Sequence, residues 1–168
     1  FPKDADNFIF ESNRALYVQG HVAKVLENLQ DFVRKYPKSK YAIPAASLIL
    51  DTTIASEEWD RTLQFATGFM AVPEFKATDF SKRLFAVASA SFFKKTEILH
   101  GAKDYAGTLK SADEFLKRYS ESARLVDVLT LAGNAALASP APDGKKRASE
   151  YFSRLIQEAS LPGKNINP

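Results

Sequence analysis

The 168-residue sequence contains no cysteine and only two histidines. Without cysteine the chain has no disulfide bond, no thiol nucleophile and no cysteine-based zinc site. His21 and His100 each lie beside a glycine at an expected turn, so we interpret both as solvent-exposed turn residues. The sequence also lacks a glycine-rich phosphate loop, a zinc-binding histidine pair and a calcium loop. We therefore expect no enzyme activity, no cofactor and no metal site.

The sequence also lacks a strong charge of one sign and a long hydrophobic run. Its 23 basic and 20 acidic side chains give a formal net charge of +3, so nucleic acid is not the expected partner. The densest basic stretches fall at expected loops or helix ends, where cations suit the helix dipole. No apolar run reaches the roughly 18 residues that a membrane helix needs, so we expect no membrane insertion.

An internal repeat is present instead. The segment Phe32–Ser39 returns as Phe115–Ser122, and six of the eight aligned pairs are identical or chemically alike. In both copies a basic and apolar helix end reaches an aromatic residue, then a Pro or Ser, then a short polar link. The opening residues 1–4 have the same character, so we expect that another helix pair precedes them.

Apolar residues recur at intervals of three and four positions and predict an all-α fold. We expect helices at about 6–19, 22–36, 45–54, 59–70, 79–99, 102 or 104 to 119, 125–137 and 145–159. The eight prolines fit this division, because seven fall in expected connections and Pro44 falls near the first turn of a helix. Short links require antiparallel neighbours, so the eight helices predict four hairpins.

The residues expected on the buried faces of these helices are large and apolar. They include Phe8 in the first helix, Ile98 in the fifth, Leu137 in the seventh and Ile156 in the eighth.

The expected seventh helix carries the best match to a known pattern. Leu129, Ala132, Gly133 and Ala136 resemble the spacing of large and small residues in tetratricopeptide repeats, where small residues let paired helices approach. The second helices of the first three hairpins add a fixed offset, because a large residue follows the first packing residue ten positions later in each. These pairs are Val22 with Phe32, Trp59 with Phe69 and Tyr105 with Phe115.

The resemblance implies a right-handed superhelical stack of about four antiparallel hairpins, a tetratricopeptide-like α-solenoid. It would occupy residues 1–160 as part of a longer array, with residues 161–168 as a tail or linker. The run Tyr36–Ala42 is also similar to links in tetratricopeptide-like proteins of the bacterial cell envelope. That likeness implies a periplasmic or envelope-associated scaffold, with a cytoplasmic location as the alternative.

The resemblance further implies that the first helix of each hairpin lines a concave groove that binds a peptide segment or a partner subunit. The positions carried over are Asn7, Phe10, Arg14, Tyr17, Ser47, Asp51 and Ile54. Lys82, Lys94 and Lys95 are weaker candidates, because the fifth helix is out of register. Arg14 and Tyr17 are the preferred pair, because an arginine and an aromatic ring one turn apart can grip a peptide. Tyr17 has an alternative role as filler between hairpins.

The leading hypothesis is thus a protein–protein interaction scaffold, whose exposed end hairpins also allow weak self-association. One alternative is a glycan-binding or glycan-enzyme adaptor, in which exposed Phe10, Tyr17 and Trp59 rings stack on sugars. The solvent exposure of those rings separates the two. Another alternative is an accessory helical domain of a larger enzyme.

Overall fold

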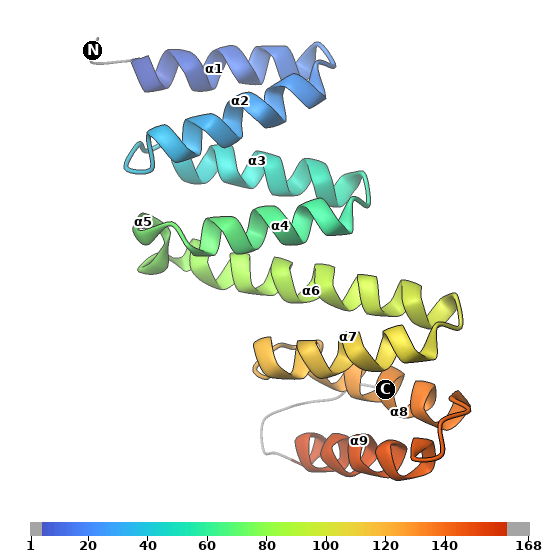
Figure 1. Cartoon of the computed structure of the whole chain (residues 1–168). Coiled ribbons are helices and arrows are strands. Elements are labelled where there is room, and N and C mark those ends of the chain that lie inside the picture. Colours follow the sequence, from blue (N-terminus) through green and yellow to red (C-terminus); the bar gives the residue numbers. More distant parts are fainter. Residues whose placement is uncertain (1–4, 161–168) are drawn as a thin grey trace. The chain divides into compact units, whose positions relative to one another are not determined.

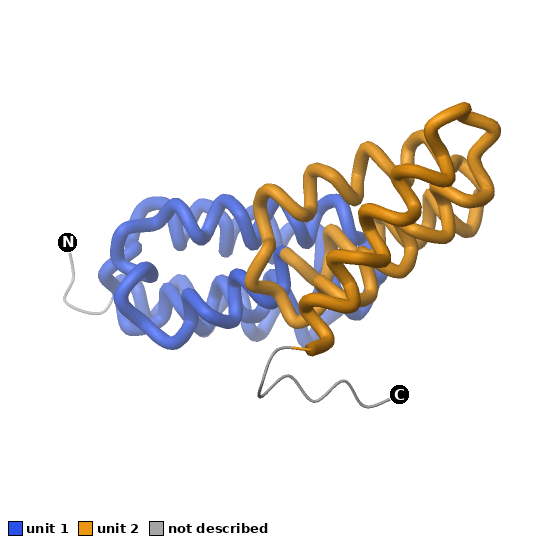
Figure 2. Tube along the Cα trace, turned by 90° about the horizontal axis from the view of Figure 1, so that it is seen from below, with its two compact units in different colours: residues 1–88 blue, residues 89–168 orange. Residues whose placement is uncertain are grey.

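The computed structural model of the protein describes residues 5–160, and within that range it is all-helical, with nine helices and no strand (Figure 1). The helices are α1 (Ala5–Val18), α2 (Val22–Lys35), α3 (Ala42–Ala55), α4 (Trp59–Met70), α5 (Pro73–Lys76), α6 (Asp79–Gly101), α7 (Tyr105–Arg118), α8 (Leu125–Ala138) and α9 (Gly144–Ala159). The chain divides into two compact units, Phe1–Ala88 and Ser89–Pro168, coloured separately in Figure 2. The division falls within α6.

Unit 1 is built by consecutive helices that pack on one another: α1 on α2, α2 on α3, α3 on α4 and α4 on α5. Helix α2 is strongly amphipathic, and its apolar positions three and four residues apart face the neighbouring helices. Val25, Leu29, Ile49, Leu50 and Ala66 are fully buried in this core.

Unit 2 repeats this arrangement, with α7 on α8 and α8 on α9. Phe115, Val128 and Leu129 are fully buried. Gly133 has a packing reason of its own, because a Cβ atom built there would lie 2.4 Å from Cε1 of Phe152. The glycine therefore lets the aromatic ring of α9 lie directly against the backbone of α8.

The two units are related by a constant spacing of 83 residues. Helix α7 begins and ends 83 positions after α2 (105 against 22, and 118 against 35). The same spacing relates the bounds of α8 to those of α3. The buried residues of α3 also have counterparts in α8 at that spacing, in order: Ala42, Ala45, Ala46, Ile49, Leu50, Thr52 and Thr53 against Leu125, Val128, Leu129, Ala132, Gly133, Ala135 and Ala136. The repeat therefore extends far beyond the eight residues that reveal it in the sequence.

The links between helices repeat as well. The amide groups of Tyr36 and Tyr119 end their helices by donating to the carbonyl groups of Phe32 and Phe115, respectively. In the links, the Ser39 and Ser122 hydroxyl oxygens each accept a hydrogen bond, at 3.1 Å, from the backbone amide two residues later.

The turns before α2 and α7 share an unusual backbone conformation. Gly20 and Lys103, again 83 positions apart, both have positive φ angles, of 85° and 59°. A positive φ is easy for glycine and unusual for lysine. Between α4 and α9 the spacing shortens to 82, which relates the buried Thr62, Ala66 and Phe69 of α4 to Gly144, Ala148 and Tyr151 of α9.

The eight expected helices are confirmed with small shifts of their ends, and α5 is an addition. Pro73, which we expected in a connection, is the first residue of this four-residue helix. Proline suits that position because its missing amide hydrogen would have no partner inside the helix. Four residues are too few to show the apolar period that revealed the other helices.

Four of the expected core residues are wrong. The exposed fractions of Phe8, Ile98, Leu137 and Ile156 are 75%, 58%, 57% and 63%. Phe8, Ile98 and Leu137 each lie one or two positions from a buried residue, which is about 100° or 200° around a helix. The apolar series therefore located the helices but misjudged the edges of their buried faces.

The expectations for residues 1–4 and for the tail at 161–168 lie outside the described residues. Among the helices of residues 5–160, none has the length and apolar character required to cross a membrane.

Candidate partner-binding site

A cleft of about 490 Å³ lies in unit 1 between the second halves of α2 and α4. Its walls are mainly apolar, and the chain between α4 and α5 closes one end. The lining residues are Gln30, Val33, Arg34, Pro37, Gln64, Phe65, Gly68, Phe69, Ala71, Val72, Pro73 and Glu74. We call this cleft the α2–α4 groove.

The groove is unobstructed along α4 because Gly68 has no side chain to fill it. A Cβ atom built on Gly68 would meet no other heavy atom within 4 Å, so the space above this residue is empty. Phe65 and Phe69 flank it on the same face, with their rings stacked at a centroid distance of 6.1 Å. The Phe65 ring is half-buried, and the guanidinium carbon of Arg61 lies 5.8 Å from its centroid. The half-buried Phe65 ring is thus the aromatic surface that the groove offers, whereas Phe69 is 6% exposed and packs mainly into the core.

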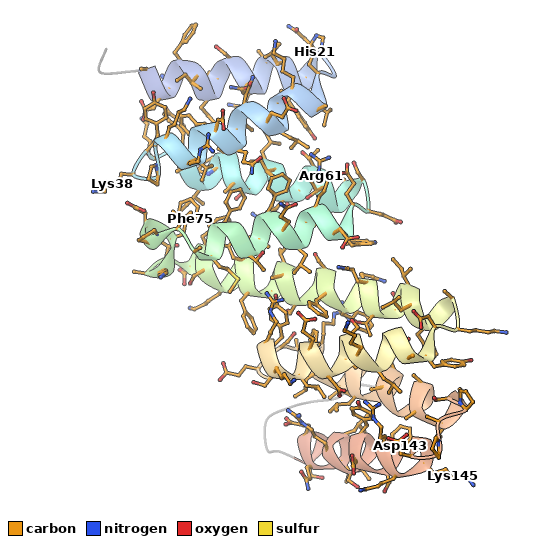
Figure 3. The ribbon with its side chains drawn as sticks, viewed as in Figure 1. His21, Lys38, Arg61, Phe75, Asp143 and Lys145 are labelled. Carbon is orange, nitrogen blue, oxygen red and sulfur yellow. The ribbon has the colours of Figure 1, made fainter. Side chains whose placement is uncertain are left out.

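The base of the groove is fixed by a chain of aromatic contacts. The ring of Phe75 on α5 meets Phe69 edge-on at 6.4 Å and Phe80 of α6 at 5.4 Å. Figure 3 labels Phe75 in α5 and Arg61 near the opposite end of α4. Phe75 is 1% exposed, so α5 anchors the chain that closes the groove.

Polar groups lie at the rim of the groove from both walls. Gln30 of α2 and Gln64 of α4 are exposed, and their side-chain amides have no hydrogen-bond partner within the described part of the chain. Arg34 is paired with Asp31 at 2.9 Å, and Glu74 stands at the closed end. Each free carboxamide can both donate to and accept from a peptide backbone.

The equivalent position in unit 2 contains a hydrogen-bonded cluster. At the repeat spacings, Gln30, Phe65 and Phe69 correspond to Asp113, Arg147 and Tyr151. One terminal nitrogen of Arg147 donates to the Asp113 carboxylate and to the Tyr151 hydroxyl, both at 2.9 Å. The Tyr151 hydroxyl donates to the other oxygen of Asp113. The cluster ties α7 to α9, whereas no such tie joins α2 to α4 among the described residues.

Burial and this bonding alter the acidity of the tyrosine. The Tyr151 side chain is 8% exposed, and burial, together with its hydrogen bond to Asp113, raises its pKa to about 12. The hydrogen bond to Tyr151 raises the pKa of Arg147, which remains a cation.

The residues predicted to bind a partner fall into three environments. Asn7 and Arg14 are exposed, and Arg14 pairs with Glu11 at 3.1 Å. Phe10 is 7% exposed and stacks on Tyr41 at 5.1 Å, so it is part of the core. Its ring therefore offers no open face to a peptide or a sugar.

The other predicted residues lie at contacts between helices. The half-buried Tyr17 of α1 accepts a hydrogen bond from Thr52 of α3 at 3.4 Å. Ser47 and Asp51 of α3 both accept hydrogen bonds from Arg83 of α6. Ile54 and Trp59 are half-buried. Tyr17 of α1 therefore contacts α3, and Ser47 and Asp51 of α3 contact α6.

The weaker lysine candidates are engaged in local pairs. Lys82 pairs with Asp79 at 3.0 Å, and Lys94 pairs with Glu97 at 2.7 Å. Lys95 is half-buried and has an interaction of its own.

The two histidines occupy turns or helix ends: His21 is exposed, whereas His100 is half-buried and meets the ring of Tyr105 at 6.0 Å. In residues 5–160 no cluster of His, Asp or Glu could hold a metal ion.

No protein-family model matches the chain, and none of the curated proteins matches its sequence.

The sequence reasoning missed the α2–α4 groove because it placed the partner on the first helix of each hairpin. Phe65 and Phe69 both fit the apolar period of the fourth helix, but only Phe69 is buried, whereas Phe65 is half-buried. One signal was available: an exposed glycine between two aromatic residues on one helix face indicates a position where a side chain would fill a space.

Proposed function

We propose that the protein is an interaction scaffold that binds an apolar, extended segment of a partner protein in the α2–α4 groove. The observation that carries the proposal is the open space at Gly68, in a groove lined by the stacked Phe65 and Phe69 rings and by the unpaired carboxamides of Gln30 and Gln64. The apolar walls suit leucine-like or aromatic side chains, and Gln30 and Gln64 suit the backbone that carries them. An extended peptide offers apolar side chains to the walls and backbone amide and carbonyl groups to the two glutamines.

The proposal includes the tetratricopeptide-like arrangement that the sequence resemblance implies. The hairpins would be α1–α2, α3–α4, α6–α7 and α8–α9, arranged as a right-handed superhelical array. The repeated helix bounds and links support a repeat protein, because each hairpin buries its apolar face against its neighbour. A periplasmic or envelope location remains a proposal that depends on the likeness of the Tyr36–Ala42 link.

The first helices of the hairpins provide the competing surface. Arg14 and Tyr17 remain the pair proposed to bind there. However, Arg14 is engaged with Glu11, and Tyr17 is half-buried against Thr52. The groove is favoured because the carboxamides of Gln30 and Gln64 are unpaired and the space at Gly68 is empty.

A single substitution tests the groove without removing a contact. Gly68→Gln places a side chain in the empty space, and because glycine is unfavourable within a helix, the variant should be about 0.5–1 kcal/mol more stable than the wild type. Gly101→Gln is the matched control, since a Cβ atom at Gly101 also meets nothing within 4 Å and Gly101 lies outside the groove.

The probe is a peptide-display library selected on the wild-type protein. We expect the selected peptides to be rich in apolar residues, to lose at least tenfold in affinity on the Gly68→Gln variant and to bind the Gly101→Gln variant normally. Selected peptides that bind the Gly68→Gln variant as tightly as the wild type would refute the groove. If the same peptides instead lose affinity on an Arg14→Ala, Tyr17→Ala double variant with unchanged helicity, the first-helix surface is the binding site.

A further inference from the structure

A second hollow, of about 540 Å³, lies in unit 2 against α7 and the start of α9. It differs from the α2–α4 groove in its charged lining. The lining residues are Ala106, Leu109, Lys110, Asp113, Glu114, Lys117, Ser139, Ala141 and Arg147. We call it the α7–α9 hollow.

The acidic residues of the hollow are already engaged. Asp113 accepts hydrogen bonds from Arg147 and Tyr151, and Glu114 pairs with Arg118 at 3.0 Å. The exposed ammonium groups of Lys110 and Lys117, by contrast, have no partner in the part of the chain that the structure describes. The charge left for a ligand is therefore positive.

The two lysines have a defined separation. They lie seven residues apart on α7, which is two helical turns and about 10 Å along the axis. A peptide in the polyproline II conformation has three residues per turn and rises about 3.1 Å per residue, so two side chains three residues apart lie on one face and are about 9 Å apart. Leu109, Ala106 and Ala141 supply apolar surface within the hollow.

Arg147 adds a guanidinium group whose position is fixed and whose charge is balanced by Asp113. Asp113 and Tyr151 hold its guanidinium at the wall of the hollow, so binding a ligand there costs little side-chain entropy. Unit 1 does not offer the same charges, since the counterparts of Lys110 and Lys117 are Glu27 and Arg34, and Arg34 is already paired with Asp31.

We propose that the α7–α9 hollow binds an acidic peptide segment that carries two carboxylates three residues apart. Lys110 and Lys117 each form an ion pair with one of these carboxylates. Charge complementarity and the matched spacing carry this assignment. It extends the proposed scaffold function to a second kind of partner segment. It does not depend on the α2–α4 groove, because the residues of the two sites belong to different units.

A nuclear magnetic resonance titration of the full chain tests the proposal. The probe is a capped tetrapeptide with glutamate at both ends and alanine between, and the matched peptide has glutamine in place of glutamate. We expect shifts of the Leu109, Asp113 and Ser139 amides with the acidic peptide only, and these should weaken as salt screens the charges. The Lys110→Gln, Lys117→Gln double variant should bind about fivefold more weakly.

A charge-matched control separates the hollow from a general effect of net charge. The Lys145→Gln, Lys146→Gln double variant loses the same charge on the first turn of α9, where Figure 3 labels Lys145, outside the lining of the hollow. It should bind the acidic peptide like the wild type. The Gly68→Gln variant should also bind it normally, which distinguishes failure of this proposal from failure of the groove.

Three results would overturn the proposal. The first is an absence of shifts in the hollow, and the second is an equal loss of affinity in both lysine double variants. The third is binding of inorganic phosphate or N-acetylglutamate as tight as that of the tetrapeptide, because the hollow would then be a site for small anions.

Discussion

The two units share helix bounds, links and buried positions, yet the space between α2 and α4 in unit 1 differs from the space between α7 and α9 in unit 2. In unit 1 this space is an apolar groove lined by Gln30, Phe65 and Phe69. In unit 2 the corresponding Asp113, Arg147 and Tyr151 join the helices through hydrogen bonds. The comparison teaches that the buried residues preserve the framework, while a few surface positions change its chemistry from apolar to charged.

The largest expected effect concerns the core difference between Leu50 and its counterpart Gly133. Leu50 is fully buried in unit 1, whereas in unit 2 the Phe152 ring occupies the space beside Gly133. Gly133→Leu should lower the free energy of unfolding by about 2–3 kcal/mol, because the new side chain overpacks against that ring. Urea denaturation measures the change, with Thr130→Leu at an exposed position of α8 as the control. Equal stability of the Gly133 variant and the wild type would show that the ring can move away.

The next effect concerns the cluster that only unit 2 contains. The pKa of Tyr151 is raised to about 12 in the folded protein. The folded state therefore holds its proton more tightly than the unfolded state, whose tyrosine titrates near pH 10. The resulting stability is fully present below pH 10 and is lost as the pH rises toward 12, by roughly 2 kcal/mol at most.

The Tyr151→Phe variant isolates this contribution. The free energy of unfolding of the wild type, measured relative to that of the variant, should fall between pH 10 and pH 12. Tyr105→Phe serves as the control, because Tyr105 lies outside the cluster. A difference between wild type and the Tyr151 variant that stays constant over this range contradicts the assignment.

The smallest expected change in stability comes from transferring the cluster into unit 1. The triple variant Gln30→Asp, Phe65→Arg, Phe69→Tyr should change the free energy of unfolding by less than about 1 kcal/mol, because the lost apolar contacts are offset by new hydrogen bonds. It should nevertheless lose the binding of apolar peptides. Calorimetry and peptide titration measure the two effects. Undiminished peptide binding would mean that the difference between the units does not determine recognition.

The helices were predictable from the sequence because each carries a buried face at regular spacing. Helix α5 was not, since it has only four residues and depends on Phe75 packing between Phe69 and Phe80. The exposed Phe8 and Ile98 show that apolar character alone does not define the buried face.

The candidate sites were less predictable than the fold. The groove depends on the empty space above Gly68, and the cluster joins residues 34 and 38 positions apart. Neither property is visible in a local pattern. An alignment of the chain with itself places Phe65 opposite Arg147 only if the spacing shortens from 83 to 82 residues before α4, and it then marks the position where the units diverge.

The most direct test of the account is a search for contacts between a selected apolar peptide and the groove. Nuclear magnetic resonance of the complex should give intermolecular Overhauser effects from the peptide side chains to Phe65, Gly68 and Val33. A complex whose contacts lie instead on Arg14 and Tyr17, with none to these three residues, would contradict the claim that the α2–α4 groove binds the partner.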